Sequence, residues 1–365
     1  MPKNKEKFSL KDELFNVPKV QKIAQEIKAV YASFDVEAFT DEVLALFSEL
    51  ELKERMYHIR DMFRKYLPDN FREATDILLK ALPPELDNTQ TDDDFGDFIY
   101  APYSEFVVAY GCCDELLGFS LDALREMTKR FSIEYAIRDF INHYPQETLA
   151  MLEECALSEN YHERRLASEG LRPKLPWAKK LTLDYREAMQ PLEKLYYDKT
   201  RYVTRSVANY LNDIAKVDAP LVIETLKRWK STEKQEPKEM MYIENHALRT
   251  LVKQGNEEAL ALLGYKKNPQ IEVFDVILNS NRVCIGEFLG FGMEIKARED
   301  VKLMVDYIIH FRTKRGTLSP KVHKLKKLSV KKGEKMSLKK RHLFKVNMST
   351  RTLYEGEHKL EIQIN

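Results

Sequence analysis

Apolar residues recur every three to four positions through the first 267 residues, which is the spacing of one face of a helix. Short breaks with Pro, Asp, Asn or Gly separate these segments, and no alternating strand pattern lies between them. The pattern therefore predicts an all-α region with helices at residues 19–34, 52–66, 71–82, 103–110, 121–129, 133–143, 147–155, 201–214, 221–230 and 241–253.

Part of this helical region repeats. The pair Arg164-x-x-Ala167 recurs as Arg205-x-x-Ala208, and a third helix places Ala247 so that the alanines lie 41 and 39 residues apart. A period near 40 with two helices per unit is typical of HEAT-like repeats, in which a small residue lets neighbouring helices approach. The spacing predicts an α-solenoid, whose concave inner face can hold a duplex or a protein.

After Asn268 the apolar period changes from 3.6 to two residues. All odd positions of 301–311 are apolar, and residues 360, 362 and 364 alternate with polar neighbours in the same way. Further short strands are predicted at 271–278, 288–295, 322–330 and 339–346. Six or seven short strands are typical of an all-β immunoglobulin-like sandwich. We therefore predict two domains, at residues 1–267 and 268–365.

Composition narrows the class of protein. The chain has 365 residues, of which 44% are hydrophobic and 32% charged, as in soluble globular proteins. It shows no signal peptide near its start and no apolar run of the ~20 residues that cross a bilayer, so no membrane partner is expected. Its four cysteines lack C-x-x-C spacing, which argues against disulfides and zinc and favours a bacterial-type cytosol. The acidic run Asp92-Asp93-Asp94 is interpreted as a solvated loop.

The net charge of +1 hides an uneven distribution. Residues 268–365 hold 20 Lys and Arg against 11 Asp and Glu, whereas the part before them is acidic. Within 311–345 there are 14 basic residues and one acid, Glu334, and the cluster includes Lys326, Lys327, Lys331 and Lys332. This pattern fits either a solvated basic face or a surface that contacts nucleic-acid phosphates.

The stretch 161–177 joins a short helix to a proline-fixed tail. Gly170 can end the helix, and Pro173 and Pro176 should hold the next residues in an extended segment. The corner brings together a carboxylate, a guanidinium, an ammonium and an indole, from Glu169, Arg172, Lys174 and Trp177. A site for a cationic aromatic ligand on a polyanion could use all four groups.

The candidate carboxylates are Glu134, Glu169 and Asp213, each expected on a helix with an arginine nearby. No nucleotide-binding, serine-hydrolase or zinc-protease motif occurs, and the eight histidines are scattered singly. Glu134 with Arg138, and Arg165 with Glu169, have i,i+4 spacing, so both pairs are also explained as ordinary ion pairs. Arg205, Asn209 and Asp213 share one helix face, which is either a polar stripe or a track for phosphates beside a carboxylate.

Three motifs carry a family resemblance. They are Arg130-Phe131-Ser132-x-Glu134-x-Ala136-Ile137-Arg138, the run Arg164-Arg165-Leu166-Ala167-Ser168-Glu169-Gly170 followed by Arg172-Pro173-x-Leu175-Pro176-Trp177, and Arg205-Ser206-Val207-Ala208-Asn209-x-Leu211-Asn212-Asp213. With Asp93-Asp94-Phe95-Gly96-Asp97-Phe98-Ile99-Tyr100-Ala101-Pro102, they resemble the AlkC-type DNA glycosylases for alkylated bases. The resemblance covers the whole chain and includes the C-terminal immunoglobulin-like domain that one branch carries.

The resemblance implies a monofunctional glycosylase that removes cationic N3-alkylated bases, chiefly 3-methyladenine and 3-methylcytosine, from double-stranded DNA in base excision repair. Such a base leaves as a neutral molecule, so the reaction needs a carboxylate near C1′ rather than a general acid. The implied catalytic residues are Glu169, Asp213 and Glu134, and the implied substrate-binding aromatics are Trp177 and Tyr135. The implied DNA-binding residues are Arg138, Arg165, Arg172, Lys174, Arg205, Asn209, Lys326, Lys327, Lys331 and Lys332.

The resemblance further implies that the base is not flipped into a pocket, which agrees with a solenoid whose sequence gives no sign of a deep cavity. We expect no cofactor, no metal and a monomer that acts at the nucleoid. Two other classes of protein remain open. One is a non-catalytic HEAT-repeat scaffold that binds DNA or a protein, and the other is an adaptor whose basic sandwich contacts an acidic partner.

Overall fold

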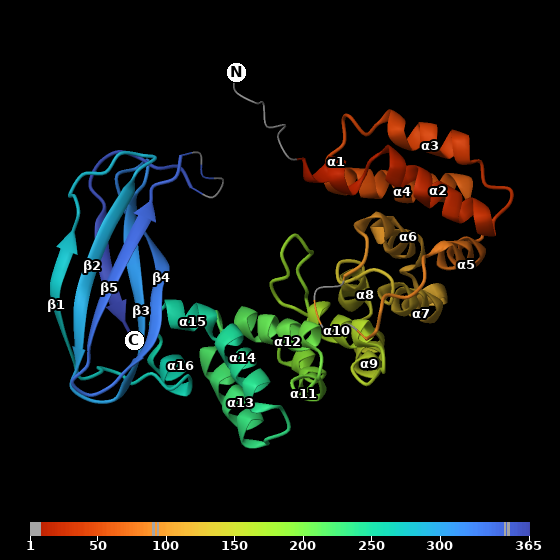
Figure 1. Ribbon diagram of the computed structural model, residues 1–365. Helices are drawn as coiled ribbons and strands as arrows, with labels where there is room; N and C mark the ends of the chain where they lie inside the picture. The colour runs from red at the N-terminus through yellow and green to blue at the C-terminus, as the bar shows by residue number, and fades with distance from the viewer. Residues whose placement is uncertain (1–8, 90–91, 93–94, 347, 349–350) are drawn as a thin grey trace. The chain divides into compact units, whose positions relative to one another are not determined.

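The computed structural model describes residues 9–89, 92, 95–346, 348 and 351–365 (Figure 1). Helices fill the chain as far as Leu262, and strands follow from Ile271. The chain divides into two compact units. The first unit comprises Met1–Val217 with Arg228–Ala247, and the second comprises Asp218–Lys227 with Leu248–Asn365. The change from helix to strand thus falls where the sequence indicates, while the division of function between 1–267 and 268–365 stays a prediction.

The helices are α1 (Leu10–Leu14), α2 (Val17–Val30), α3 (Val36–Ala45), α4 (Leu52–Tyr66), α5 (Phe71–Ala81), η1 (Phe98–Tyr100), α6 (Ala101–Gly111), η2 (Asp114–Leu116), α7 (Leu117–Thr128), α8 (Ile137–His143), α9 (Pro145–Cys155), α10 (Tyr161–Glu169), η3 (Glu187–Met189), α11 (Leu192–Leu195), α12 (Arg201–Ile214), α13 (Ala219–Ser231), α14 (Pro237–Ala247), α15 (Arg249–Lys253) and α16 (Glu257–Leu262). The bounds of α4 and α12 match the prediction. The sequence pattern missed α1 and α3, and it placed the start of α8 four residues too early. It also joined α14 and α15 into one helix.

The predicted helical repeat is present. Helix α12 packs against α10 on one side and α14 on the other, so every second helix is a neighbour in space. Ala167, Ala208 and Ala247 lie on these three helices and are fully buried. A methyl side chain lets two helix backbones come close, which explains the alanine at each of these positions. The first unit is therefore a HEAT-like α-solenoid.

The second unit contains an immunoglobulin-like sandwich of two three-stranded sheets in the described part of the chain (Figure 1). Its strands are β1 (Ile271–Leu278), β2 (Phe288–Ala297), β3 (Val301–Arg312), β4 (Leu318–Val330), β5 (Lys335–Leu343) and β6 (Lys359–Ile364). One sheet has the order β1-β2-β5 and the other β4-β3-β6, and all neighbouring strands are antiparallel. Alternate residues such as Ile295, Leu303 and Val305 form the core between the sheets. The alternation in the sequence thus marks the buried face of each strand.

No helix within the described ranges is long and apolar enough to cross a membrane.

Candidate active site

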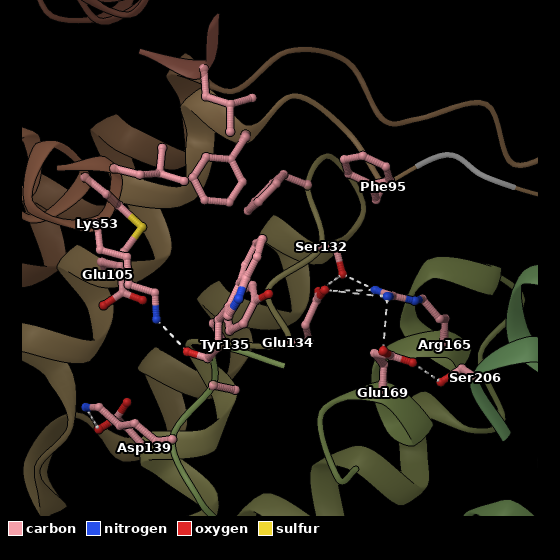
Figure 2. A pocket seen from close by; sticks show the side chains of 18 of the residues that line it. Lys53, Phe95, Glu105, Ser132, Glu134, Tyr135, Asp139, Arg165, Glu169 and Ser206 are labelled. Atoms are coloured by element: carbon pink, nitrogen blue, oxygen red, sulfur yellow. Dashed lines mark hydrogen bonds and ion pairs between the residues drawn. The ribbon is translucent and has the colours of Figure 1, made fainter. Parts of the chain in front are cut away.

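A pocket of about 530 Å³ lies in the first unit (Figure 2). Its lining comes from α1, α4, η1, α6, α8, α10 and α12, from the segments before η1 and before α8, and from the loop after α10. Figure 2 shows Glu134, Arg165, Glu169 and Ser206 joined by polar contacts on one side. The sequence shows no sign of this cavity, and the expectation that the base is not flipped into a pocket stays a prediction. The cavity forms because α1 and α4 pack near residues more than 100 positions later, which a local pattern does not reveal.

A backbone bridge holds the entrance to α8 in place. Gly96 pairs with Phe131, and the Ser132 amide donates to the Phe95 carbonyl at 3.0 Å. Gly96 has φ +80°, and a Cβ there would lie 2.2 Å from the Arg130 carbonyl oxygen. Only glycine fits both the conformation and the space. The bridge keeps residues 133–136 out of the helix that the sequence predicts, and Glu134 lies on a turn.

Glu134 pairs with Arg165 of α10 in the wall of the pocket. Arg165 Nη1 lies 3.1 Å from Glu134 Oε2, and the Ser132 hydroxyl donates to the same carboxylate. Burial lowers the pKa of Arg165, but Glu134 and then Glu169 outweigh it and raise the pKa above the usual value. The predicted i,i+4 pair between Glu134 and Arg138 is wrong, because Glu134 is not helical.

Glu169 ends α10 and is almost fully buried. Its Oε1 accepts from Arg172 Nη1 at 2.7 Å and lies 3.7 Å from Arg165 Nη2, and its Oε2 accepts from the Ser206 hydroxyl at 2.7 Å. Burial raises the pKa of Glu169, but Arg165, Arg172 and the Ser206 hydroxyl together hold it below its ordinary value. The Ser168 hydroxyl donates to Ser206 at 2.7 Å and fixes that side chain. Glu169 is therefore a carboxylate kept ionised inside the pocket wall.

Asp213 lies behind this wall. It is 2% exposed, does not line the pocket, and accepts from Arg172 Nε at 3.1 Å. Arg172 is itself buried between Glu169 and Asp213. Of the three predicted carboxylates, Glu134 and Glu169 thus line the pocket. Asp213 does not, and it contacts Glu169 only indirectly, through Arg172.

Arg138 is 1% exposed, and its guanidinium donates to three backbone carbonyls. Its partners are Gly170 and Arg172, both at 2.9 Å, and Lys179 at 2.6 Å. Burial, followed by the nearby Arg172 charge, lowers the pKa of Arg138 to about 10. This guanidinium therefore holds the turn after α10 in place. Gly170, at the start of that turn, has an ordinary right-handed backbone, but a Cβ there would collide with the Ile137 side chain.

Trp177 lines the pocket and is 73% exposed. The segment after Gly170 forms turns rather than the predicted extended chain, and Trp177 has φ 63°, which is rare for a bulky residue. Lys53 Nζ of α4 donates to the Trp177 carbonyl at 2.5 Å and lies 5.7 Å from the centre of the Tyr135 ring. Lys53 therefore ties the loop that carries the indole to a helix 124 residues earlier. Lys174 is exposed.

The predicted polar track on α12 is only partly at the pocket. Arg205 and Asn209 line it, and Arg205 also pairs with Asp92, so that acid is not merely solvated. Asp93 and Asp94 lie outside the described residues. Asn209 Oδ1 lies 2.8 Å from His246 Nε2 of α14.

The predicted lysines of the sandwich are exposed in the second unit. Lys326 and Lys327 lie on β4, and Lys331 and Lys332 lie in the turn between β4 and β5. Lys331 Nζ pairs with Asp300 at 2.8 Å, and the Lys332 amide donates to the same carboxylate. None of these four lysines lines the pocket.

The polar pocket residues that the prediction missed include Ser206, Lys53 and Glu105. Ser206 belongs to the motif that begins at Arg205, so the sequence offered a reason to expect it at the site beside Glu169. The sequence offered no such reason for Lys53 and Glu105, because helix periodicity does not indicate which distant helix faces the site. Burial, followed by the charge of Asp139, raises the pKa of Glu105. Within the described residues no three acidic, His or Cys side chains gather as metal ligands, and the expectation of a metal-free site stays a prediction.

Comparisons with known proteins agree with this architecture. The family model of the C-terminal Ig-like domain of the uncharacterised protein YhaZ matches residues 272–365. The uncharacterised protein YhaZ of Bacillus subtilis (strain 168) is 33% identical over 357 residues, covering 97% of this chain and 95% of that protein. The structure of Pseudomonas fluorescens alkylpurine DNA glycosylase AlkC, bound to DNA containing an abasic site analogue, is similar with a TM-score of 0.87. It is 30% identical and covers 98% of this chain and 96% of that one. The chain therefore belongs to the AlkC family, in the branch with a C-terminal immunoglobulin-like domain.

Proposed function

We propose that this protein is a monofunctional DNA glycosylase that hydrolyses the N-glycosidic bond of cationic N3-alkylated bases, 3-methyladenine and 3-methylcytosine, in base excision repair. The observation that carries the proposal is the ionised Glu169 in the wall of a pocket, in a chain similar over almost its whole length to an alkylpurine DNA glycosylase. Its substrate is alkylated duplex DNA in the cytosol, and it acts as a monomer without metal or cofactor.

The electrostatics of the pocket suit a cationic leaving group. As the glycosidic bond breaks, positive charge moves from the base to the sugar, and a nearby carboxylate stabilises that charge. Glu169 accepts hydrogen bonds from Arg172 and Ser206 and forms an ion pair with Arg165, so it holds its negative charge without a proton and is fixed in position. Glu134 completes the acidic wall and can orient the attacking water.

We assign Asp213 a positioning role, because it contacts Arg172 rather than the pocket. Trp177 offers an exposed indole to a cationic base or sugar, and such a contact gains roughly 0.5–2 kcal/mol. Tyr135 adds a second aromatic face beside Glu134. Arg138 and Arg172 shape the site from inside, while Arg165, Lys174, Arg205 and Asn209 are our candidates for phosphate contacts near it.

The test is release of free base from N3-methylated duplex DNA by the purified full-length chain, measured by mass spectrometry. We expect 3-methyladenine and 3-methylcytosine to be released by the wild type and lost with Glu169→Gln. The matched control is Glu159→Gln, which removes an exposed carboxylate just before α10 and outside the pocket. Duplex binding without release of either base would instead support a non-catalytic HEAT-repeat scaffold.

A further inference from the structure

The pocket has a second wall that the proposed reaction does not use. It is formed by five apolar residues from α1, α4, η1 and the segment before α8, namely Leu14, Leu52, Met56, Phe98 and Phe131. We call these residues the apolar wall. The Phe98 and Phe131 rings meet edge to face at 5.7 Å, and Phe131 lies three residues before Glu134. The apolar wall therefore adjoins the acidic wall in one cavity.

The cavity has the character of a small-molecule site. Its volume of about 530 Å³ falls in the range of ligand pockets, ~300–1,000 Å³. Such pockets are mostly apolar and aromatic, with a few polar groups that fix the ligand. A contact with the sugar and backbone of a duplex needs carboxylates and cations, and it does not need buried Met56 or the Phe98–Phe131 pair.

We propose that the apolar wall binds the excised base, a neutral N-alkylated heteroaromatic molecule, after the glycosidic bond has broken. This inference rests on the proposed glycosylase function. It assigns the pocket a ligand of its own, the product base, and predicts that this product inhibits the enzyme.

The chemistry explains why one cavity has two walls. In the cationic nucleotide, the bonding electrons of the glycosidic bond move onto the base, which becomes neutral, and water adds its oxygen to C1′ and releases a proton. Before cleavage the positive charge is attracted to Glu134 and Glu169. After cleavage that attraction is lost, and the neutral aromatic ring gains more from apolar and aromatic surface than from carboxylates.

The first experiment measures binding of free 3-methyladenine to the DNA-free full-length chain by equilibrium dialysis. The same binding is measured for 3,9-dimethyladeninium, a permanent cation that resembles the base before cleavage. We expect Leu52→Asp to weaken binding of 3-methyladenine at least tenfold and to leave or strengthen binding of the cation. Leu52 is the half-buried first residue of α4, where an acid suits the helix dipole, so the variant should fold.

The matched control is Val36→Asp, at the half-buried first residue of α3 and outside this pocket. It should bind both probes as the wild type does. Leu52→Met, which restores an apolar side chain, should restore binding of 3-methyladenine. Equal weakening of both probes by Leu52→Asp would overturn the proposal, because the wall would then not distinguish the product.

A second measurement separates this inference from the proposed function. Free 3-methyladenine is added to base-release reactions, and each protein is compared with its own uninhibited rate. Inhibition of the wild type and Val36→Asp, but much weaker inhibition of Leu52→Asp, is the expected result. An active glycosylase that neither binds nor is inhibited by 3-methyladenine would overturn the product site alone. A protein that binds 3-methyladenine but releases no base would overturn the glycosylase and leave a base-binding pocket.

Discussion

Glu169 shows how individual side chains set the chemistry of the pocket. A buried carboxylate normally takes up a proton more readily, because low polarity disfavours its charge. Here two arginines and a serine hydroxyl reverse that tendency, and the pKa of Glu169 is lowered. The Arg165–Glu169 contact could be predicted from i,i+4 spacing. The insertion of Arg172 between Glu169 and Asp213 could not, because it depends on how the turn after α10 meets α12.

This arrangement predicts unequal effects of neutralising the two acids. Glu169→Gln removes the charge beside the reacting sugar and should slow single-turnover excision by about a hundredfold or more. Asp213→Asn weakens the contacts of Asp213 with Arg172 and Lys216, neither of which lines the pocket, so the expected loss is about tenfold, or ~1.4 kcal/mol. Duplex binding should stay nearly unchanged in both variants, and thermal unfolding serves as the control for folding. A larger loss for Asp213→Asn than for Glu169→Gln would contradict the positioning role of Asp213.

The lowered pKa of Glu169 also predicts the pH dependence of excision. A carboxyl group whose pKa is depressed in the folded protein stays ionised down to lower pH, and its contribution to stability is lost only as pH falls through that lowered value. The excision rate, corrected for spontaneous base loss, should therefore be flat from about pH 8 to about pH 5. A decline should begin only below the ordinary glutamate pKa of 4.5. An acid limb centred between pH 5 and 7 would show that Glu169 is not held ionised or that another group controls the rate.

At the scale of elements, the segment before α8 shows tertiary contacts overriding local propensity. The apolar spacing at Ile133, Ile137 and Ile141 predicts a helix from residue 133, but the helix begins at Ile137. The Gly96–Phe131 bridge holds the intervening residues as turns and aims Glu134 at Arg165. The sequence contains both Gly96 and Phe131, but a local pattern does not reveal that these two residues pair across 35 positions.

Gly96→Ala should disturb this element strongly. A left-handed backbone costs a non-glycine residue ~1–3 kcal/mol, and the new Cβ would also meet the Arg130 carbonyl oxygen. We expect urea unfolding to show a loss of at least ~1 kcal/mol, together with slower excision, because Ser132 and Glu134 shift.

Gly118→Ala is the matched control for this substitution. Gly118 lies in α7, and nothing lies within 4 Å of the added Cβ. That variant should gain ~0.4–1 kcal/mol of stability and keep its excision rate. Equal stability of the two variants would mean that the bridge at Gly96 is not required for folding.

At the scale of the whole chain, the change of apolar period predicted the architecture well. The helical period, with alanines about 40 residues apart, predicted the solenoid. Strict alternation after Asn268 predicted the strands of the sandwich, and the predicted strand bounds differ from the observed ones by a few residues. These patterns succeed because each element buries one face in its own domain. The prediction missed the pocket because the pocket depends on which distant helices meet, and the periodic pattern of the sequence does not indicate this.

The basic surface of the sandwich gives the prediction at this scale. If Lys326 and Lys327 on β4 contact phosphates, each lost contact should reduce the slope of log K against log salt by about 0.9. The full-length double variant Lys326→Glu/Lys327→Glu should therefore bind undamaged duplex more weakly and with a slope shallower by up to ~1.8. Single-turnover excision at saturating protein should persist, because neither lysine lines the pocket.

The pair Lys331→Glu/Lys332→Glu provides the comparison within the same surface. Asp300 pairs with Lys331 and accepts from the Lys332 backbone, so the charge of Lys331 is already partly offset. The salt slope of this double variant should therefore change by less than the ~1.8 expected when two phosphate contacts are lost. The full-length chain is the right background for both measurements, since α15 and α16 belong to the same compact unit as the sandwich and a cut at Lys267 would uncover them. If neither double variant changes affinity or salt dependence, the basic face does not contact DNA and serves solvation or another acidic partner.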